Sequence, residues 1–167
     1  EQHDVIPDIV ILGKALSGGV YPVSAVLADD DIMLCIKPGE HGSTFGGNPM
    51  AGKVAMAALK VIKDEKLAEN ADAMGQLFRA RMEAIKSPLI TSVRGKGLLN
   101  AIVIKPFEHN FEERTAYYVC LKLKDAGLLA KQTHTHIIRF APPLVINEAQ
   151  LLDCVAIIIK TLKQFDK

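Results

Sequence analysis

The sequence predicts an α/β protein in two parts: a portion of a large parallel-sheet domain in residues 1–87 and a small α+β domain in residues 88–167. The first observation is the run at residues 8–12, which is nearly all apolar and β-branched, as in a strand buried on both faces of a parallel sheet. The second is the order strand, helix, strand, helix after Pro88, which makes a self-contained unit. Two strands and a long helix cannot close a sheet, so we expect the first part to need further chain.

The first part is expected to contain two short strands and a long helix. The strand at 8–12 ends in a loop of small residues, and a second strand is expected at 23–27, ended by the acidic residues 29–31. Asn48 is a good N-cap, and Pro49 suits the first position of a helix. The helix that follows carries small or apolar residues at helical spacing: Ala51, Ala55, Ala58 and Ile62.

A second helix is expected over residues 70–86, and Ser87 with Pro88 ends it. Its apolar face consists of Met74, Phe78, Met82 and Ile85. The small domain then has five expected elements: strands at 91–94, 98–104 and 137–140, a helix over 113–126, and a final helix from 148 onward. The spacing of Asn147 and Gln150 predicts a capping box for that last helix.

Composition and charge exclude several classes of protein. The sum of Lys and Arg is 20 against 19 for Asp and Glu, so the basic excess of a nucleic-acid-binding surface is missing. Cys35, Cys120 and Cys154 are too widely spaced for a disulfide framework or a zinc site, and we expect small buried side chains in a reducing compartment. No apolar run approaches the ~18 residues of a membrane helix. We therefore expect neither nucleic acid nor a membrane as a partner.

Lys14 is the residue that points most directly to chemistry. It lies where an apolar strand ends, with Gly13 before it and small residues after it. Active groups of open α/β sheets collect at the carboxyl ends of strands. Partial desolvation at such a place favours the free amine that a Schiff base needs. The alternative is a solvated lysine at a strand end. A Walker A phosphate loop is excluded because Ala15, and not Ser or Thr, follows the lysine.

Residues 41–49, His-Gly-Ser-Thr-Phe-Gly-Gly-Asn-Pro, form a second candidate site. The three glycines let backbone approach a ligand closely, while Ser43 and Thr44 supply hydroxyl groups. A loop of this kind ahead of a helix N-terminus suits a phosphate group. The alternative is an ordinary tight loop with a helix cap.

Arg139 stands in the middle of the apolar strand at 137–141. An arginine in such a place needs an anionic partner or a path to water, and its guanidinium binds a carboxylate through two parallel hydrogen bonds. The alternative is an outward-facing residue of a half-exposed strand.

Two further clusters were weighed as metal sites. His134 and His136 could place two imidazoles on one face of a strand, but no third ligand is well placed, which favours a loop. The acidic run at 29–31 is interpreted as a solvated turn. We therefore expect no metal.

The candidate residues fall in four segments: 7–19, 41–49, 93–99 and 138–144. In this order they resemble the cofactor-lysine segment, the phosphate-binding loop and two C-terminal signatures of the class III pyridoxal-phosphate-dependent aminotransferases, which have the fold-type I architecture. The resemblance covers essentially the whole chain. Residues 21–25 and 36–40 are most similar to members that act on ornithine, and members that act on acetylornithine are the nearest alternative.

The resemblance implies a role for each candidate residue. Lys14 forms the Schiff base with pyridoxal 5'-phosphate and later moves the proton of the reaction. Thr44, with its backbone amide, binds the cofactor phosphate, and Ser43 lies beside it near the substrate. Arg139 holds the carboxylate of glutamate or 2-oxoglutarate. In the family the phosphate-binding loop reaches the active site of the other subunit, so a homodimer or a higher homo-oligomer is implied.

The implied activity moves the δ-amino group of ornithine to 2-oxoglutarate, giving glutamate 5-semialdehyde and glutamate, in the mitochondrial matrix or the cytoplasm. The alternatives are another class III ω-aminotransferase and a non-catalytic, truncated C-terminal dimerisation module. Family members are more than twice this length, and the groups that grip the cofactor ring would precede Glu1. The resemblance therefore implies that this chain alone is weakly active or inactive.

Overall fold

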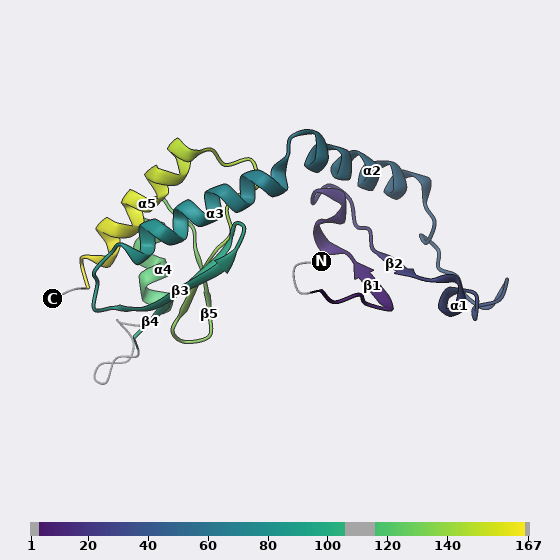
Figure 1. Ribbon diagram of the computed structural model, residues 1–167, viewed down its shortest axis with the longest axis horizontal. Helices are drawn as coiled ribbons and strands as arrows, with labels where there is room; N and C mark the ends of the chain where they lie inside the picture. The colour runs from purple at the N-terminus through teal and green to yellow at the C-terminus, as the bar shows by residue number, and fades with distance from the viewer. Residues whose placement is uncertain (1–3, 106–115, 166–167) are drawn as a thin grey trace. The chain divides into compact units, whose positions relative to one another are not determined.

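The computed structural model describes residues 4–105 and 116–165 (Figure 1). The chain divides into two compact units, Glu1–Glu65 and Lys66–Lys167. The boundary between these units, after residue 65, lies earlier in the chain than the boundary at residue 87 that the sequence pattern predicts. The reason is the helix after residue 66, which the sequence pattern placed with the first part but which packs against the strands and helices of the second unit.

The first unit is built from short elements. In chain order they are strand β1 (Ile9–Leu12), the 3-10 helix η1 (Lys14–Ser17), strand β2 (Ala25–Ala28), helix α1 (Asp30–Met33) and helix α2 (Pro49–Asp64). The expectation of parallel strands buried on both faces is not met in this unit. β1 and β2 pair with each other in antiparallel register, Ile9 opposite Ala28, because the chain turns back through residues 13–24. Ile11 of β1 is 76% exposed, since the described part of the unit adds no third strand and no cover to that face.

The first unit has almost no core of its own. Among its described residues only Ser17 is buried, and no residue of α2 is buried. α2 nevertheless has an apolar face, on which Met56 is 62% exposed and Leu59 is 52% exposed. This agrees with the expectation that two strands and a helix do not make a self-sufficient domain.

Over residues 66–105 and 116–165, the second unit is an α+β sandwich of one sheet and three helices. Its elements are α3 (Leu67–Glu83), β3 (Ile90–Lys96), β4 (Leu99–Ile104), α4 (Ala116–Asp125), β5 (Lys131–Thr133), β6 (Ile137–Phe140) and α5 (Glu148–Leu162). The strand order is β3-β4-β6-β5, and every neighbouring pair is antiparallel. α3 and α4 pack on the sheet, and α5 packs on both helices (Figure 1). Strand β5 was not predicted, and residues 113–115 of the helix predicted over 113–126 lie outside the described residues.

The core of the second unit is continuous. Apolar side chains alternate inward along β4 and β6, where Ile102, Ile104 and Ile138 are each 1% exposed or less. The predicted face of α3 is confirmed in part, because Phe78 and Met82 are buried in this core. Burial of such side chains is worth roughly 1.5–3 kcal/mol each, so this unit carries most of the apolar stabilisation.

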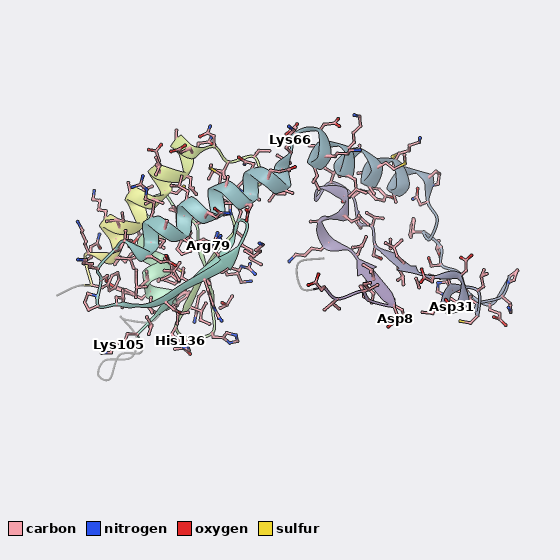
Figure 2. The ribbon with its side chains drawn as sticks, in the orientation of Figure 1. Asp8, Asp31, Lys66, Arg79, Lys105 and His136 are labelled. Atoms are coloured by element: carbon pink, nitrogen blue, oxygen red, sulfur yellow. The ribbon has the colours of Figure 1, made fainter. Side chains whose placement is uncertain are left out.

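One polar cluster lies inside this unit, where α3 meets the β3–β4 turn. Asn100 is 2% exposed, and its Oδ1 accepts a hydrogen bond of 2.7 Å from Nη1 of Arg79. Arg79, labelled on α3 in Figure 2, also donates to the carbonyl oxygen of Gly97 at 3.1 Å. Asn100 donates to the same oxygen at 3.2 Å. The helix, the turn and the strand are therefore held together by satisfied polar groups.

None of the helices, as far as residues 4–105 and 116–165 are described, combines the length and apolar character needed to cross a lipid bilayer.

Candidate active site

The lysine turn, residues 13–21, begins directly after β1. Lys14 is exposed and opens η1 with a φ of 53°, in the left-handed region, where a residue with a side chain pays roughly 1–2 kcal/mol. Gly18 closes η1 with a φ of 67°. Strained backbone of this kind persists where neighbouring groups hold it and is concentrated at functional sites.

Ser17 is the group that holds the lysine turn. Its side chain is 1% exposed, and its Oγ donates to the carbonyl oxygen of Tyr21 and accepts from the Tyr21 amide at 3.1 Å. α2 packs against η1, where Gly18 faces Ala58 closely. The position of Lys14 is therefore fixed from inside the turn and from the neighbouring helix.

The glycine loop, residues 41–48, is the second segment of the site. Residues 41–47 are exposed, and they include both hydroxyl residues, Ser43 and Thr44. Oγ of Ser43 accepts from the Gly46 amide at 2.8 Å, and a side chain at position 46 would collide with that oxygen. Gly47 has a φ of 73°. Position 47 thus favours glycine for its backbone conformation, whereas a side chain at position 46 would displace the Ser43 hydroxyl from this hydrogen bond.

Asn48 joins the glycine loop to α2 and to the lysine turn. Its Oδ1 accepts from the Met50 amide at 2.9 Å, which confirms it as the N-cap, with Pro49 in the first helical position. Its Nδ2 donates to the hydroxyl oxygen of Tyr21 at 3.0 Å. One side chain therefore fixes the start of α2 and binds two loops to each other.

A cavity of about 1100 Å³ lies among the lysine turn, residues 22–24, the glycine loop and the first residues of α2. Lys14 and Ser43 both line it, together with Tyr21 and Asn48, whereas Thr44 is not among the lining residues. The cavity is large enough for a cofactor of a few hundred cubic ångströms. An amine, a hydroxyl and glycine backbone thus face one space ahead of a helix N-terminus, which attracts anions.

Arg139 lies in the second unit, on β6, and is half-buried. It stands on the sheet face away from the core, because its neighbours Ile138 and Phe140 are the residues that point into the core. Across the sheet it is in register with Ala101, which is in register with Arg94, and on the other side with Lys131.

The surroundings of Arg139 are basic. A hollow of about 410 Å³ contains Arg139 with Arg94, Lys96 and His134. Among residues 4–105 and 116–165 no acidic side chain forms an ion pair with Arg139. Arg139 therefore faces outward, as the second interpretation expects, and its role in binding a carboxylate stays a prediction.

The candidate metal ligands do not form a cluster in the described part of the chain. His134, with a φ of 58°, and His136 lie in the turn between β5 and β6. Asp29 is the N-cap residue of α1, and Asp30 and Asp31 form its first turn. In the part of the chain that the structure describes, no group of three His, Cys, Asp or Glu could hold a metal ion.

Sequence reasoning missed the link between Tyr21 and Asn48. Tyr21 entered it only as part of a resemblance, and Asn48 only as a cap. The available signal was a tyrosine within a loop of small residues, since a tyrosine hydroxyl that becomes partly buried takes a hydrogen-bond partner. The partner itself is 27 residues away and could not be named without the fold.

Comparisons with known proteins show the family of the chain. The class-III aminotransferase family matches residues 1–162. The chain is 62% identical over 160 residues to the mitochondrial ornithine aminotransferase of Drosophila ananassae, covering 96% of this chain and 36% of that protein. It is 59% identical over 165 residues to the mitochondrial ornithine aminotransferase of Rattus norvegicus, covering 99% and 37%. The chain thus spans little more than a third of the length of these curated relatives.

Solved structures similar to this chain are also aminotransferases. An acetylornithine aminotransferase from Elizabethkingia anophelis superimposes with a TM-score of 0.89 at 63% identity, covering 98% of this chain and 43% of that one. An ornithine δ-aminotransferase from Plasmodium falciparum superimposes with a TM-score of 0.86 at 48% identity, covering 99% and 41%. The expected fold class, part of a fold-type I aminotransferase, is confirmed. From its lysine turn to its last helix, the chain belongs to the class-III aminotransferase family.

Proposed function

We propose that the chain is the part of an ornithine aminotransferase that carries the cofactor lysine, and that the whole enzyme moves the δ-amino group of ornithine to 2-oxoglutarate. The products are glutamate 5-semialdehyde and glutamate. The observation that carries this proposal is Lys14, an exposed lysine fixed on its turn at the wall of a cavity, in a chain that is 62% identical to an ornithine aminotransferase. Because the chain spans little more than a third of that relative, the remaining groups of the site come from outside it.

The cavity fits pyridoxal 5'-phosphate. It offers an amine at Lys14 for the aldehyde end, and the glycine loop offers hydroxyl and amide groups ahead of a helix N-terminus for a phosphate group. In the proposed homodimer Lys14 would hold the cofactor of its own subunit, while the Thr44 hydroxyl and amide, with Ser43 beside the substrate, would serve the phosphate end of the partner subunit's cofactor. When bound, the cofactor supplies the electron sink that the amino-group transfer needs.

Two side chains of this chain act on the substrate in this proposal. Lys14, once its amine is free, would act as the general base that takes the proton from the substrate carbon and as the general acid that gives it back during the transfer. Arg139 binds the carboxylate of glutamate or 2-oxoglutarate through its two parallel N–H groups. The basic neighbours of Arg139 add to the attraction of an anionic substrate toward this face.

A chimera tests this function. In it, these residues replace the matching 36% of the Drosophila ananassae relative, which supplies everything else. We expect ornithine-dependent production of glutamate from 2-oxoglutarate at a rate within about tenfold of the parent enzyme, since one order of magnitude corresponds to about 1.4 kcal/mol in the barrier. Lys14→Ala should lower that rate by a factor of roughly 10²–10⁴ or more.

The chimera needs a matched control, and Lys53→Ala provides it because Lys53 is an exposed lysine of α2 that the proposal gives no role. Its rate should stay at the level of the unsubstituted chimera. A chimera that folds and binds pyridoxal 5'-phosphate but transfers no amino group from ornithine would refute the proposed function.

A second candidate donor is N-acetylornithine, because the Elizabethkingia anophelis protein of that name is 63% identical to this chain. The two donors differ by an acetyl group that removes the positive charge of the α-amine. Comparison of kcat/KM for the two donors in the full-length enzyme decides between them: a preference for ornithine supports the first candidate, and a preference for N-acetylornithine the second.

A further inference from the structure

We propose that a row of cations across the outer face of the four-stranded sheet discriminates between the two substrates by their charge. The row consists of Lys131, Arg139 and Arg94, and it attracts the anionic amino acceptor, 2-oxoglutarate, while it repels the cationic donor, ornithine. This inference rests on the proposed function, in which Arg139 holds a carboxylate. It goes beyond that function because it makes Arg94 and Lys131 determinants of specificity that act through their charge and need no contact with substrate.

The row follows from the register of the strands. Arg139 on β6 is opposite Lys131 on β5 and, on its other side, opposite Ala101 on β4, which in turn is opposite Arg94 on β3. Residues in register on neighbouring strands share a face and lie about 5 Å apart, so Arg94 is about 10 Å from Arg139 along the row. Because Ile138, the neighbour of Arg139, points into the core, the row lies on the outer face.

Ala101 leaves space between the two arginines. Its side chain ends at Cβ, and the hollow of about 410 Å³ that contains Arg139 extends over this position to Arg94 and Lys96. Among the described residues that line the hollow, none is Asp or Glu. The hollow is large enough for a small dicarboxylate, and its charged lining is basic.

The sheet concentrates positive charge that the chain as a whole balances. Within their described bounds, the four strands carry Arg94, Lys96, Lys131 and Arg139 and contain no Asp or Glu, whereas the whole chain has 20 basic and 19 acidic residues. Like charges directly opposite each other on neighbouring strands destabilise a sheet, and Lys131 and Arg139 are such a pair. An anion over the row would relieve this repulsion, so the arrangement favours an anionic substrate.

The two substrates carry net charges of opposite sign. Near neutral pH, 2-oxoglutarate has two carboxylates, whereas ornithine has two ammonium groups and one carboxylate. Coulomb's law in water gives roughly a factor of two in rate for one pair of unit charges at about 10 Å. One cation of the row should therefore raise kcat/KM about fourfold for the doubly negative acceptor and lower it about twofold for the singly positive donor.

The test neutralises each flanking cation in the chimera described above. Arg94→Gln and Lys131→Gln each remove one charge, and Arg94→Lys keeps the charge on a different side chain. Lys160→Gln is the matched control, because Lys160 is an exposed lysine of α5, which packs on α3 and α4. The readout is kcat/KM for 2-oxoglutarate divided by kcat/KM for ornithine, each measured with the other substrate saturating.

This ratio separates an effect of charge from damage to the structure, which lowers both values together. Arg94→Gln and Lys131→Gln should each lower the ratio about four- to eightfold, and Arg94→Lys and Lys160→Gln should leave it unchanged. The effect should disappear in about 1 M salt, where charges act over only about 3 Å. An unchanged ratio in the two neutralising variants, or a change that salt does not reduce, would overturn the proposal.

A second measurement, on the 167-residue chain, does not depend on transfer of an amino group. Titration with 2-oxoglutarate, followed through the NMR shifts of the Ala101 and Arg139 amides, should show saturable binding that Arg94→Gln weakens about fourfold. No shift, or equal affinity in Arg94→Gln, would overturn the row even if the chimera transfers the amino group of ornithine. Weakened affinity together with a chimera that transfers none would support the row and refute the proposed function.

Discussion

Cys120 shows what burial does to a single ionisable side chain. It lies on α4, 8% exposed, and desolvation raises the pKa of its thiol from 9.0 to about 11, although a hydrogen bond with the Gln132 backbone lowers the pKa in part. Burial also raises the pKa of Cys154, with a smaller contribution from the negative charge of Asp153. Both thiols are therefore neutral and poor nucleophiles near neutral pH. The expectation of three small buried side chains is met by Cys120, whereas Cys154 is half-buried and Cys35 is exposed.

The raised pKa of Cys120 predicts a loss of stability at alkaline pH. Between pH 9 and pH 11 the unfolded chain loses the thiol proton while the folded chain keeps it, so the unfolded state binds fewer protons and the free energy of unfolding falls as pH rises. The free energy contributed by this group is fully present below pH 9. Urea unfolding of the second unit at a series of pH values measures it. In Cys120→Ala this part of the slope should disappear, and an unchanged slope would contradict the assignment.

Gly75 and Gly52 form a matched pair of helical glycines with opposite surroundings. A Cβ on Gly75 would collide with the carbonyl oxygen of Gly97, whereas a Cβ on Gly52 would meet nothing within 4 Å. We expect Gly75→Ala to destabilise the second unit by about 1–3 kcal/mol or more, as forced overpacking does. Gly52→Ala should instead stabilise α2 by about 0.5–1 kcal/mol. Circular dichroism during urea unfolding measures both, and equal effects would contradict the packing of α3 on the β3–β4 turn.

Helix ends could be predicted because capping is local chemistry. Asn147 and Gln150 form the expected capping box of α5, with hydrogen bonds of 2.9 and 3.1 Å in the two directions. Asn147→Ala should cost about 1 kcal/mol in the free energy of unfolding, because it leaves the first-turn amides without that acceptor. Asn147→Ser is the control that should keep most of the stability. Equal losses in the two variants would show that the side-chain oxygen is not what stabilises the helix start.

Strand pairing was less predictable than helix ends. The apolar run at 8–12 correctly indicated a strand. The strand that pairs with it, and the direction of that strand, depend on the tertiary fold, and in this chain β2 pairs with it in antiparallel register. The exposure of Ile11 could not be predicted from this run, since an apolar pattern shows that a strand face favours burial and does not show whether other chain covers it. β5 was missed because three residues, one of them the charged Lys131, carry no recognisable pattern.

The candidate site was predictable to the extent that its chemistry lies in contiguous segments. Lys14 and Ser43 were chosen from the sequence, and they line one cavity. Thr44 lies in the same loop but outside the lining, and Arg139 belongs to the other compact unit, so their roles stay predictions. The hydrogen bond between Tyr21 and Asn48 could not be predicted, because a contact across 27 residues is a product of the tertiary fold.

At the scale of the whole molecule, the two units differ in how they are stabilised. The second has a continuous core of buried side chains, whereas the first buries only Ser17 among its described residues. The chemistry-bearing residues Lys14, Ser43 and Thr44 all lie in that first unit. The candidate site residues therefore lie in the unit with almost no core of its own.

A homodimer is proposed for the whole enzyme, with the glycine loop of one subunit serving the cofactor of the other. In the chimera, Lys14→Ala and Thr44→Ala should each reduce activity strongly. If the loops are exchanged, a mixed dimer contains one site with both substitutions and one site with neither, so mixing the two inactive proteins restores part of the activity. If each chain uses its own loop, mixing restores none. Activity after co-refolding, against each variant refolded alone, decides the matter.

The central claim is that Lys14 is the cofactor lysine, and covalent trapping tests it most directly. The chain is incubated with pyridoxal 5'-phosphate, reduced with borohydride and digested, and the adduct on each lysine is quantified by mass spectrometry. Lys53, another exposed lysine, on α2, is the comparator, and denatured chain is the control. The account predicts adduct concentrated on Lys14 in the folded chain and spread over the lysines after denaturation. Adduct distributed evenly between Lys14 and Lys53 in the folded chain would contradict it.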